Sequence, residues 1–344
     1  MQRILVTGGA GFIGSHFVRH LLGRYDYQVT NLDKLTYAGN LDNLRDVQDH
    51  PRYSFVQGDI ADPTLVRRLT EQADAIVNFA AETHVDRSLM EAGAFITTDV
   101  LGTYVLLEAA RRRGIQRFLH ISTDEVYGEA TDGRSFREDD PLHPRSPYAA
   151  SKTAADMQCL AFFETYGLPV VIARPSNNLG PNQHPEKAIP LFVTNALEDQ
   201  PLPVYGDGLQ VRDWLFVLDD CQALDLLLHQ GVPGQIYNIS ANQERQNLRV
   251  AEKILDLLGK PRTLLRLVED RPGHDRRYSL DATKLRALGW QPQHPFDEAL
   301  ETTVRWYADN RWWWEKIRAG DFRKYYRKQY GRRLTAGRPP PLGG

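Results

Sequence analysis

The feature that most constrains the fold is the glycine loop at residues 7–14, TGGAGFIG. Gly8, Gly11 and Gly14 stand three residues apart, between a short apolar run at 4–7 and an amphipathic stretch at 12–22. Glycines at this spacing allow a tight turn, a close approach of pyrophosphate to the backbone and close packing of helix on strand. The first amides of the helix then face the phosphates. The loop therefore predicts a dinucleotide site; a plain glycine turn is the alternative.

Strands and helices are predicted to alternate along the front half of the chain. Short apolar runs predict strands at 29–33, 53–57, 75–79, 118–122 and 170–174, and amphipathic stretches predict helices at 63–70, 101–113 and 147–166. Apolar runs without polar alternation are typical of strands buried on both faces, and strand–helix alternation gives a parallel sheet. We predict an α/β fold: a doubly wound, Rossmann-like parallel sheet with a smaller mixed α/β C-terminal substrate domain.

The rhythm changes after Pro175, where prolines interrupt the pattern and later strands are predicted at 216–217 and 236–240. A chain of 344 residues suits one large domain or two intimate ones. We predict a dinucleotide-binding domain over 1–180 plus about 211–240. A substrate domain is expected over about 181–210 plus 241–331. The Pro/Gly-rich end, 332–344, is predicted to be a disordered tail.

Charge is distributed unevenly along the chain. The net charge is −2, yet residues 311–344 contribute +8 and residues 1–310 contribute −10. With 42% apolar and 25% charged residues the composition is that of a globular protein, not of a disordered chain. Cys159 and Cys221 are too isolated for a disulfide framework or a zinc site, so no metal is expected. No segment suits a signal peptide or a membrane span, which predicts a soluble, cytoplasmic protein.

Two acidic residues follow the next predicted strands. Asp33 ends the second strand, 19 residues after Gly14, where a carboxylate binds the adenosine ribose hydroxyls. A carboxylate there repels a 2′-phosphate, so NAD is favoured over NADP, although Lys34 follows directly. Asp59 comes after the third strand and could meet the adenine rim. Its alternative role is a cap for the helix that follows Asp62.

Tyr148 and Lys152 lie four residues apart and share one face if the segment is helical. A nearby ammonium is expected to lower the pKa of the tyrosine from about 10. The phenolate could then take the hydroxyl proton of an alcohol as hydride leaves carbon for a nicotinamide. Ser122 and Thr123 end the preceding strand, at the edge of an α/β sheet where ligands bind. An exposed Tyr/Lys pair on an amphipathic helix is the alternative.

These stretches resemble the extended short-chain dehydrogenases/reductases, and within them the dTDP-glucose 4,6-dehydratase family. The resemblance covers about residues 1–331. Its matching stretches are 7–15, 32–40 (LDKLTYAGN), 79–88 (FAAETHVDRS), 122–128 (STDEVYG), 146–148 with Lys152, 174–181 (RPSNNLGP), 185–187, 206–208, 212–214 and 270–278 (DRPGHDRRY). Relatives that only oxidise and reduce mostly lack the acidic pair at 124–125, so that pair is the discriminating feature.

The resemblance implies a division of catalytic work. Glu125 would remove the C5 proton of a hexose oxidised at C4, and Asp124 would protonate the departing C6 hydroxyl. Thr123 would hold the C4 oxygen beside Tyr148, with Lys152 as its partner. Two adjacent carboxyls can divide such roles if their environments separate their pKa values. An acidic turn or a helix cap is the alternative for the pair.

The resemblance also implies binding residues and partners. The cofactor would be NAD, and the substrate a nucleoside-diphosphate hexose bound by a homodimer built on helices near 100–113 and 147–166. The NAD residues would be Gly8, Gly11, Phe12, Ile13, Gly14, Asp33, Lys34, Thr36, Asp59, Ile60, Ala80, Ala81, Tyr148, Lys152 and Asn177. The substrate residues would be Ser88, Asn178, Lys187, Arg212, Asn247, Arg271 and His274.

Three alternatives remain at this point. A 4-epimerase, a decarboxylase or a UDP-sugar 4,6-dehydratase would share most of these motifs. A non-catalytic NAD sensor would share the fold, although such proteins tend to lose the Tyr/Lys pair. The basic, aromatic end of the chain could suggest single-stranded nucleic acid, but we favour packing aromatics with a solvated basic face and expect neither nucleic acid nor membrane as a partner.

Overall fold

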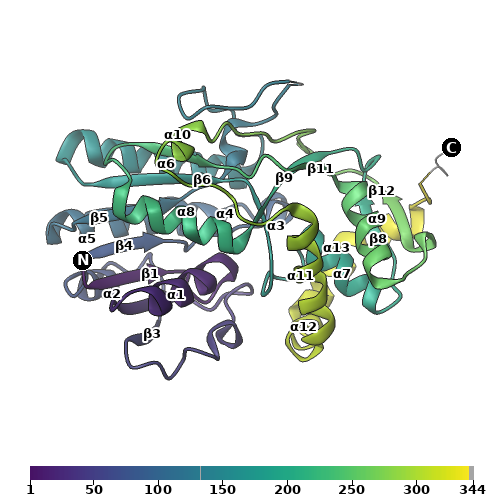
Figure 1. Cartoon of the computed structure of the whole chain (residues 1–344), viewed down its shortest axis with the longest axis horizontal. Helices are drawn as coiled ribbons and strands as arrows, with labels where there is room; N and C mark the ends of the chain where they lie inside the picture. The colour runs from purple at the N-terminus through teal and green to yellow at the C-terminus, as the bar shows by residue number, and fades with distance from the viewer. Residues whose placement is uncertain (132, 341–344) are drawn as a thin grey trace.

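The computed structural model describes residues 1–131 and 133–340, and its largest element is a seven-stranded parallel sheet (Figure 1). The strands stand in the order β10-β6-β5-β4-β1-β2-β3. Their bounds are β1 (Arg3–Thr7), β2 (Gln28–Asp33), β3 (Tyr53–Gln57), β4 (Ala75–Asn78), β5 (Arg117–Ile121), β6 (Val170–Pro175) and β10 (Ile236–Ile239). The predicted strands of the front half are therefore confirmed to within a residue or two.

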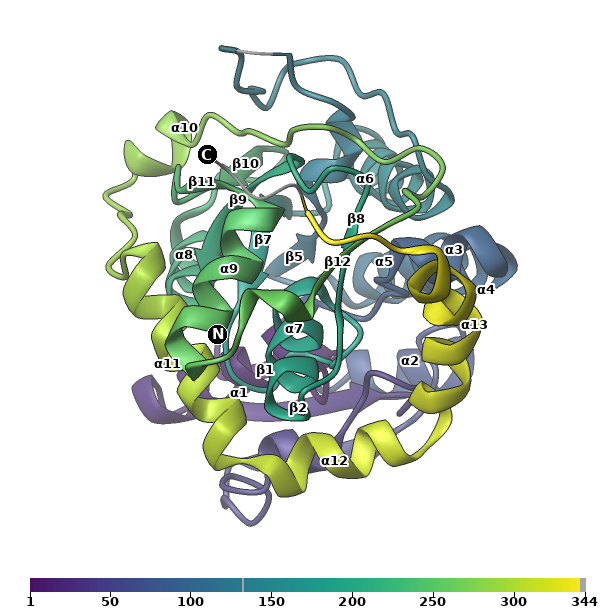
Figure 2. The same cartoon turned by 90° about the vertical axis from the view of Figure 1, so that its right-hand side faces the viewer.

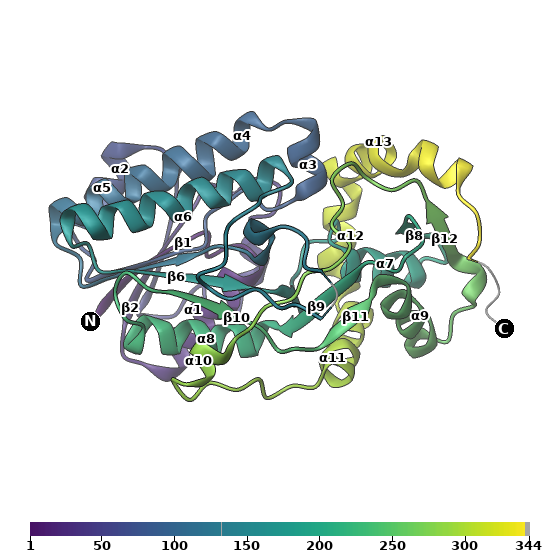
Figure 3. The same ribbon diagram turned by 90° about the horizontal axis from the view of Figure 1, so that it is seen from above.

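Helices cover both faces of this sheet (Figure 3). One face carries α1 (Phe12–Arg24) and α8 (Val217–Gln230); the other carries α2 (Pro63–Thr70), α5 (Thr103–Arg113) and α6 (Pro147–Tyr166). Successive side chains of a strand point to opposite faces, so Ile4 and Val6 join the core under α1 and α8, while Leu5 joins the core under α5. The predicted doubly wound α/β class is confirmed.

Short helical segments complete this part of the chain. They are η1 (Leu41–Leu44), α3 (Val85–Met90), α4 (Gly93–Phe95), the π-helical η2 (Ile96–Gly102), η3 (Asp124–Tyr127) and α10 (Thr283–Arg286). The helix predicted from residue 101 thus begins in a π-helical turn that runs directly into α5.

The second part of the molecule is a mixed α/β unit with its own apolar core. Its sheets are β11-β9-β7, which is mixed, and β12-β8, which is parallel. Their strands are β7 (Asn177–Leu179), β8 (Leu202–Tyr205), β9 (Val211–Phe216), β11 (Glu244–Gln246) and β12 (Leu265–Val268). The helices are α7 (Ala188–Leu197), α9 (Asn247–Leu258), η4 (Arg262–Leu264), α11 (Phe296–Asp309), α12 (Arg311–Ala319) and α13 (Asp321–Ala336).

The segment 211–240 divides between the two parts. Helix α8 packs on the large sheet and β10 joins its edge, as predicted, whereas β9 pairs with β7 and β11 in the small sheet. The predicted strand at 216–217 is the end of β9 followed directly by the first residue of α8. The exact division into two domains stays a prediction.

The prediction of a disordered tail from residue 332 is wrong for residues 332–340. Helix α13 continues to Ala336, because Tyr330 and Leu334 pack against Leu191 and its neighbours. Beyond the helix, Arg338 pairs with Leu267 through two backbone hydrogen bonds of 2.7 and 3.0 Å. Residues 341–344, the rest of the predicted tail, lie outside the described residues. Figure 2 shows α11, α12 and α13 following one another around the outside of the second part.

Within residues 1–131 and 133–340, no helix is both long and apolar enough to cross a membrane.

A buried carboxylate joins α1 to α8, the two helices that cover the same face of the large sheet. Asp225 on α8 contacts His20 Nε2 at 2.9 Å, His229 Nδ1 at 3.0 Å and the hydroxyl of Tyr25 at 2.9 Å. Burial raises the pKa of Asp225, but these hydrogen bonds outweigh it and hold the pKa below its ordinary range. The same hydrogen bond raises the pKa of His229 above 6.5. Asp225 therefore joins α8 to α1 through His20, and its pairing with His229 within α8 makes part of this stabilisation depend on pH.

We expect Asp225→Asn to lower the free energy of unfolding by about 1–3 kcal/mol at about pH 6, because three hydrogen bonds lose a charged acceptor. The His229 contribution is present below pH 6.5 and is lost as the pH rises through its raised folded-state pKa. The difference in the free energy of unfolding between wild type and variant, measured by urea unfolding, should accordingly become smaller towards about pH 9. Asp26→Asn, an exposed neighbour, is the control and should change little; a gap that widens with pH would contradict the assignment.

Candidate active site

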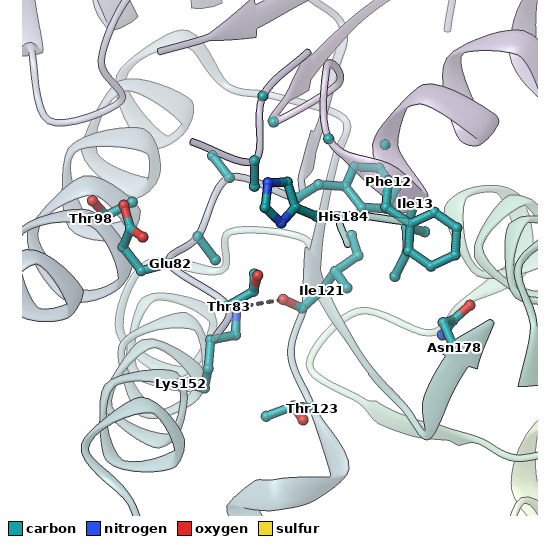
Figure 4. Close-up of a pocket in the computed structure, with 18 of the residues that line it drawn as sticks. Phe12, Ile13, Glu82, Thr83, Thr98, Ile121, Thr123, Lys152, Asn178 and His184 are labelled. Atoms are coloured by element: carbon teal, nitrogen blue, oxygen red, sulfur yellow. Dashed lines mark hydrogen bonds between the residues drawn. The ribbon is translucent and has the colours of Figure 1, made fainter. Parts of the chain in front are cut away.

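The site lies where the carboxyl ends of the strands meet, at the point where the strand order reverses between β1 and β4. A cavity of about 300 Å³ opens there, lined by both parts of the molecule (Figure 4). Every residue predicted to bind NAD, from Gly8 to Asn177, lines this cavity, and so do Thr123, Asp124 and Glu125. The tertiary structure thus brings the cofactor and catalytic candidates together.

The glycine loop forms a cradle that side chains would fill. Gly8 has φ +70°, and a Cβ there would lie 2.6 Å from the amide nitrogen of Ala80. A Cβ on Gly14 would lie 2.4 Å from the carbonyl oxygen of Gly8. Gly11 is the N-cap of α1, and no side chain of the described residues caps this helix end. The loop geometry and the free helix start fit the pyrophosphate of a dinucleotide.

The ribose end of the cavity carries Asp33 and Asp59. Asp33 is buried, and its two oxygens accept the amides of Ala10 at 2.9 Å and Leu35 at 2.8 Å. Lys34 follows Asp33 in the sequence and left the choice between NAD and NADP undecided. In the structure it pairs with Asp59 at 2.6 Å. The helix cap that was the alternative for Asp59 is made by Asp62, which accepts the first amides of α2. A site with two carboxylates and a neutralised lysine disfavours a 2′-phosphate.

The acidic pair begins the short helix η3, directly after β5. The Thr123 hydroxyl caps this helix by accepting the Glu125 amide at 3.3 Å, and donates to Asp124 Oδ1 at 3.2 Å. Asp124 Oδ2 is buried and has no hydrogen-bond partner among the described residues. Burial, and next the charge of Glu125, raise the pKa of Asp124 to about 8. Asp124 is therefore a carboxyl that keeps its proton at neutral pH.

Glu125 has a different electrostatic environment. Burial raises its pKa above the ordinary value, and the charges of Arg271, Lys187 and Arg212 offset only part of that rise. The hydroxyl of Tyr278 reaches Glu125 Oε2 at 3.4 Å. Three cations act on the Glu125 carboxyl, whereas one oxygen of Asp124 has no hydrogen-bond partner among the described residues. Such different surroundings shift the pKa values of two carboxyls by different amounts, so that one can act as an acid and the other as a base.

Helix α6 places Tyr148 and Lys152 one turn apart. Ser146 caps the helix by accepting the Ala149 amide at 3.0 Å, and Pro147 occupies the first turn. The prediction that Lys152 lowers the pKa of Tyr148 is wrong for this structure. Burial, followed by the charge of Glu125, raises the pKa of Tyr148 well above 10, and Lys152 donates instead to the carbonyl of Ile121 at 2.7 Å (Figure 4).

The substrate candidates fall into two groups. Asn178 and Lys187 line the cavity, whereas Ser88, Arg212, Asn247, Arg271 and His274 do not. Arg212 donates to the carbonyls of Val211 and Asp275 and stacks on Tyr278 at 4.1 Å. Arg271 pairs with Asp86 at 3.1 Å, and Lys187 donates to the carbonyl of Thr83.

These three cations nonetheless approach the site, because their charges act on Glu125. The other candidates have local partners. His274 Nδ1 lies 2.6 Å from Asp270, and the Ser88 hydroxyl donates to the Val85 carbonyl at 2.7 Å. The backbone amide of Asn247 donates to the Gln210 carbonyl at 2.9 Å.

Sequence reasoning missed Glu82 and Tyr278. Glu82 lines the cavity, and burial together with the charge of Asp99 raises its pKa to about 7. Its position in the sequence could have identified it, because Glu82 comes shortly after β4 as Thr123 comes shortly after β5. Since β4 and β5 are parallel, the two residues lie at the same edge of the sheet. Tyr278 contacts Glu125, which is 153 residues away in the sequence, and no local sequence pattern predicts such a contact.

The doubly wound sheet, the glycine cradle and a cavity lined by Tyr148, Lys152 and the acidic pair define a short-chain dehydrogenase/reductase of the kind that modifies nucleotide sugars. Within it, the chain belongs to the GDP-mannose 4,6 dehydratase family, whose model matches residues 5–303.

Individual relatives match most of the chain. A low-salt glycan biosynthesis protein, Agl12, of Haloferax volcanii is 54% identical, covering 88% of this chain and 98% of the relative. A dTDP-glucose 4,6-dehydratase of Streptomyces niveus is 52% identical over 93% of this chain and 97% of its own length. The crystal structure of DesIV, a dTDP-glucose 4,6-dehydratase of Streptomyces venezuelae with NAD bound, is 51% identical, with a TM-score of 0.90 over 92% of this chain and 100% of that one.

If Asp124 is the acid that protonates a leaving hydroxyl, as the resemblance implies, turnover should fall as the pH rises through about 8, where this carboxyl loses its proton. The pH dependence of kcat, with substrate saturating at every pH, measures this. Asp124→Asn keeps the size and a hydrogen-bond donor but has no transferable proton, so its residual rate should show no such fall. A wild-type rate that stays constant well above pH 8 would contradict the assignment of Asp124 as the acid.

Proposed function

We propose that this chain is a dTDP-glucose 4,6-dehydratase that converts dTDP-glucose to dTDP-4-keto-6-deoxyglucose. The observation that carries the proposal is that buried Asp124 and half-buried Glu125 line the same cavity as Tyr148 and the glycine cradle. Oxidation alone needs only a tyrosine and a dinucleotide, whereas loss of water needs an additional acid and base. Relatives about 50% identical over nearly their whole length carry the dehydratase name, which supports the proposal.

NAD is the cofactor we propose, since Asp33 and the Lys34–Asp59 pair disfavour the 2′-phosphate of NADP. When bound, NAD accepts a hydride from C4 of the sugar and returns it to C6, so that no net oxidant is consumed. Tyr148 takes the proton of the C4 hydroxyl, and Thr123 holds the C4 oxygen. The residues that hold the cofactor are those that line the cavity around the glycine loop, Asp33 and Lys152.

The elimination follows from the two carboxyls. The C4 ketone acidifies the C5 proton, and Glu125 removes it; Glu125 then returns a proton to C5 when hydride is delivered to C6. Asp124, protonated at neutral pH, gives its proton to the C6 hydroxyl, which leaves as water. Arg212, Arg271 and Lys187 supply positive charge for the diphosphate, and arginine suits that group because its planar fork donates two parallel hydrogen bonds.

We further propose that the enzyme acts in the cytoplasm as a homodimer. Several large apolar side chains are exposed along the helical segments 96–113 and 147–166, which lie side by side: Ile96, Leu101, Tyr104, Met157 and Tyr166. Such a contiguous apolar face favours contact with a second copy. Sedimentation of the purified chain tests this, and a monomer at micromolar concentration would refute it.

Incubation of the purified chain with NAD and dTDP-glucose should yield a 4-keto-6-deoxy sugar, detected by its absorbance in alkali and by mass spectrometry as loss of one water. UDP-glucose and GDP-mannose, tested in parallel, should turn over more slowly. Formation of an epimer of unchanged mass would instead identify an epimerase, and no conversion with any of the three sugars would contradict the proposed function.

Tyr148→Phe and Glu125→Gln should each lower turnover by about 10²- to 10⁴-fold while NAD binding is retained, because each loses one proton-transfer group. The two variants differ in one readout. Glu125→Gln should also stop exchange of the C5 hydrogen with deuterated solvent, which is the step assigned to Glu125. Glu164→Gln, an exposed carboxyl on α6, is the control and should behave as wild type. Wild-type turnover in either active-site variant would refute the role assigned to that residue.

A further inference from the structure

The inner face of α13 carries polar side chains that are buried against α3. Figures 2 and 3 both show the two helices side by side. Gln329 on α13 donates through Nε2 to Asp86 Oδ2 at 3.0 Å and to the Tyr205 hydroxyl at 2.6 Å. The Tyr325 hydroxyl lies 3.5 Å from the same Asp86 oxygen. Asp86 and Gln329 are only 3% and 6% exposed, so this contact forms in a region from which water is largely excluded.

Asp86 joins this helix to the substrate candidates. Its Oδ2 also accepts the Tyr205 hydroxyl at 2.7 Å, and its Oδ1 accepts Arg271 Nη1 at 3.1 Å. We call the set Asp86, Tyr205, Arg271, Tyr325 and Gln329 the Asp86 hub. Its members come from α3, β8, the loop after β12, and α13, so the hub joins four separate segments of the chain.

Arg271 does not line the cavity, but it is the member of the hub whose charge acts on Glu125. Its side chain is 13% exposed, its charge acts directly on Glu125, and its Nε has no hydrogen-bond partner among the described residues. A buried guanidinium with an unused donor is set up to receive an anion. Asp86 occupies one edge of the guanidinium and so determines the direction in which the remaining donors point.

We propose that Gln329 is a positioning residue for the nucleotide sugar, acting through Asp86 on Arg271. The C-terminal helix holds the Asp86 carboxylate, and the carboxylate holds Arg271 in the orientation that receives the substrate's diphosphate. This inference rests on the proposed function. Pre-orienting a long, flexible arginine lowers the entropy lost on binding, so the effect belongs to substrate affinity and not to the chemical step.

The outer face of the same helix offers matched controls. Lys328 is the neighbour of Gln329 in sequence, yet it is exposed and directed away from the hub. Arg327 is likewise exposed. Substitutions there change the charge of α13 without touching Asp86.

The test compares Gln329→Leu with Lys328→Ala in the full-length enzyme. In Gln329→Leu we expect KM for dTDP-glucose and the dissociation constant of dTDP to rise about tenfold, because Arg271 is no longer held in the orientation that forms a hydrogen bond to the charged diphosphate. Turnover at saturation and NAD affinity should stay close to wild type, as should every parameter of Lys328→Ala; the unfolding temperature of Gln329→Leu should fall, because Asp86 loses a buried hydrogen bond. Equal KM values in the two variants would overturn the proposal.

A double-mutant cycle asks whether Gln329 acts through Arg271. In an Arg271→Lys background, adding Gln329→Leu should raise KM by less than twofold, since the group it positions is already gone. Full additivity of the two effects would overturn the proposal.

If Gln329→Leu fails to fold, Tyr205→Phe tests the same contact, because it removes the 2.7 Å donor to Asp86; Tyr325→Phe should have a smaller effect, because its contact is 3.5 Å. An unchanged KM in Tyr205→Phe would overturn the proposal. Failure of the wild type to make the keto sugar would count against the proposed function alone, since dTDP binding by the variants still reports on the hub.

Discussion

The parallel pairing of β1 with β2 and β4 is the constraint on which the rest of the structure depends. Its register sets Thr7 level with Leu32 on one side and with Asn78 on the other, and Asn78 level with His120 on β5. The glycine loop, the Glu82 segment and the Thr123 segment therefore leave the sheet at the same edge. Buried side chains reinforce this register: the Thr7 hydroxyl donates to Asn78 Oδ1 at 2.6 Å, and Asn78 contacts His120 at 3.2 Å.

Burial then determines the chemistry at that edge. The same low-polarity environment that raises the pKa of Asp124 also raises that of Tyr148, and it lowers the pKa of Lys152. An acid benefits from this environment, because it keeps its proton until the substrate needs it. A tyrosine that must ionise does not benefit, and Lys152 is engaged with the Ile121 carbonyl.

The two faces of the basic C-terminal segment have different surroundings. Its lysines and arginines are mostly exposed on the outer face, and its tyrosines and Gln329 are packed inside against Asp86 and Leu191. The aromatic packing that the sequence predicted for this segment is present, and the helix that carries it continues to Ala336, further along the chain than expected. A solvated basic face over an otherwise acidic chain accounts for the charge asymmetry.

Local sequence determined the elements and the outline of the site. The glycine loop, the Ser146–Pro147 start of α6 and the apolar runs of the strands depend on neighbouring residues, so their structures followed from spacing and side-chain type. The tertiary structure decided everything that depends on distant partners or on burial. Examples are the Lys34–Asp59 pair, the raised pKa of Tyr148 and the helical end of the chain. Arg271 meets Asp86 across 185 positions and Gln329 meets it across 243, and only the folded chain brings such groups together and removes them from water.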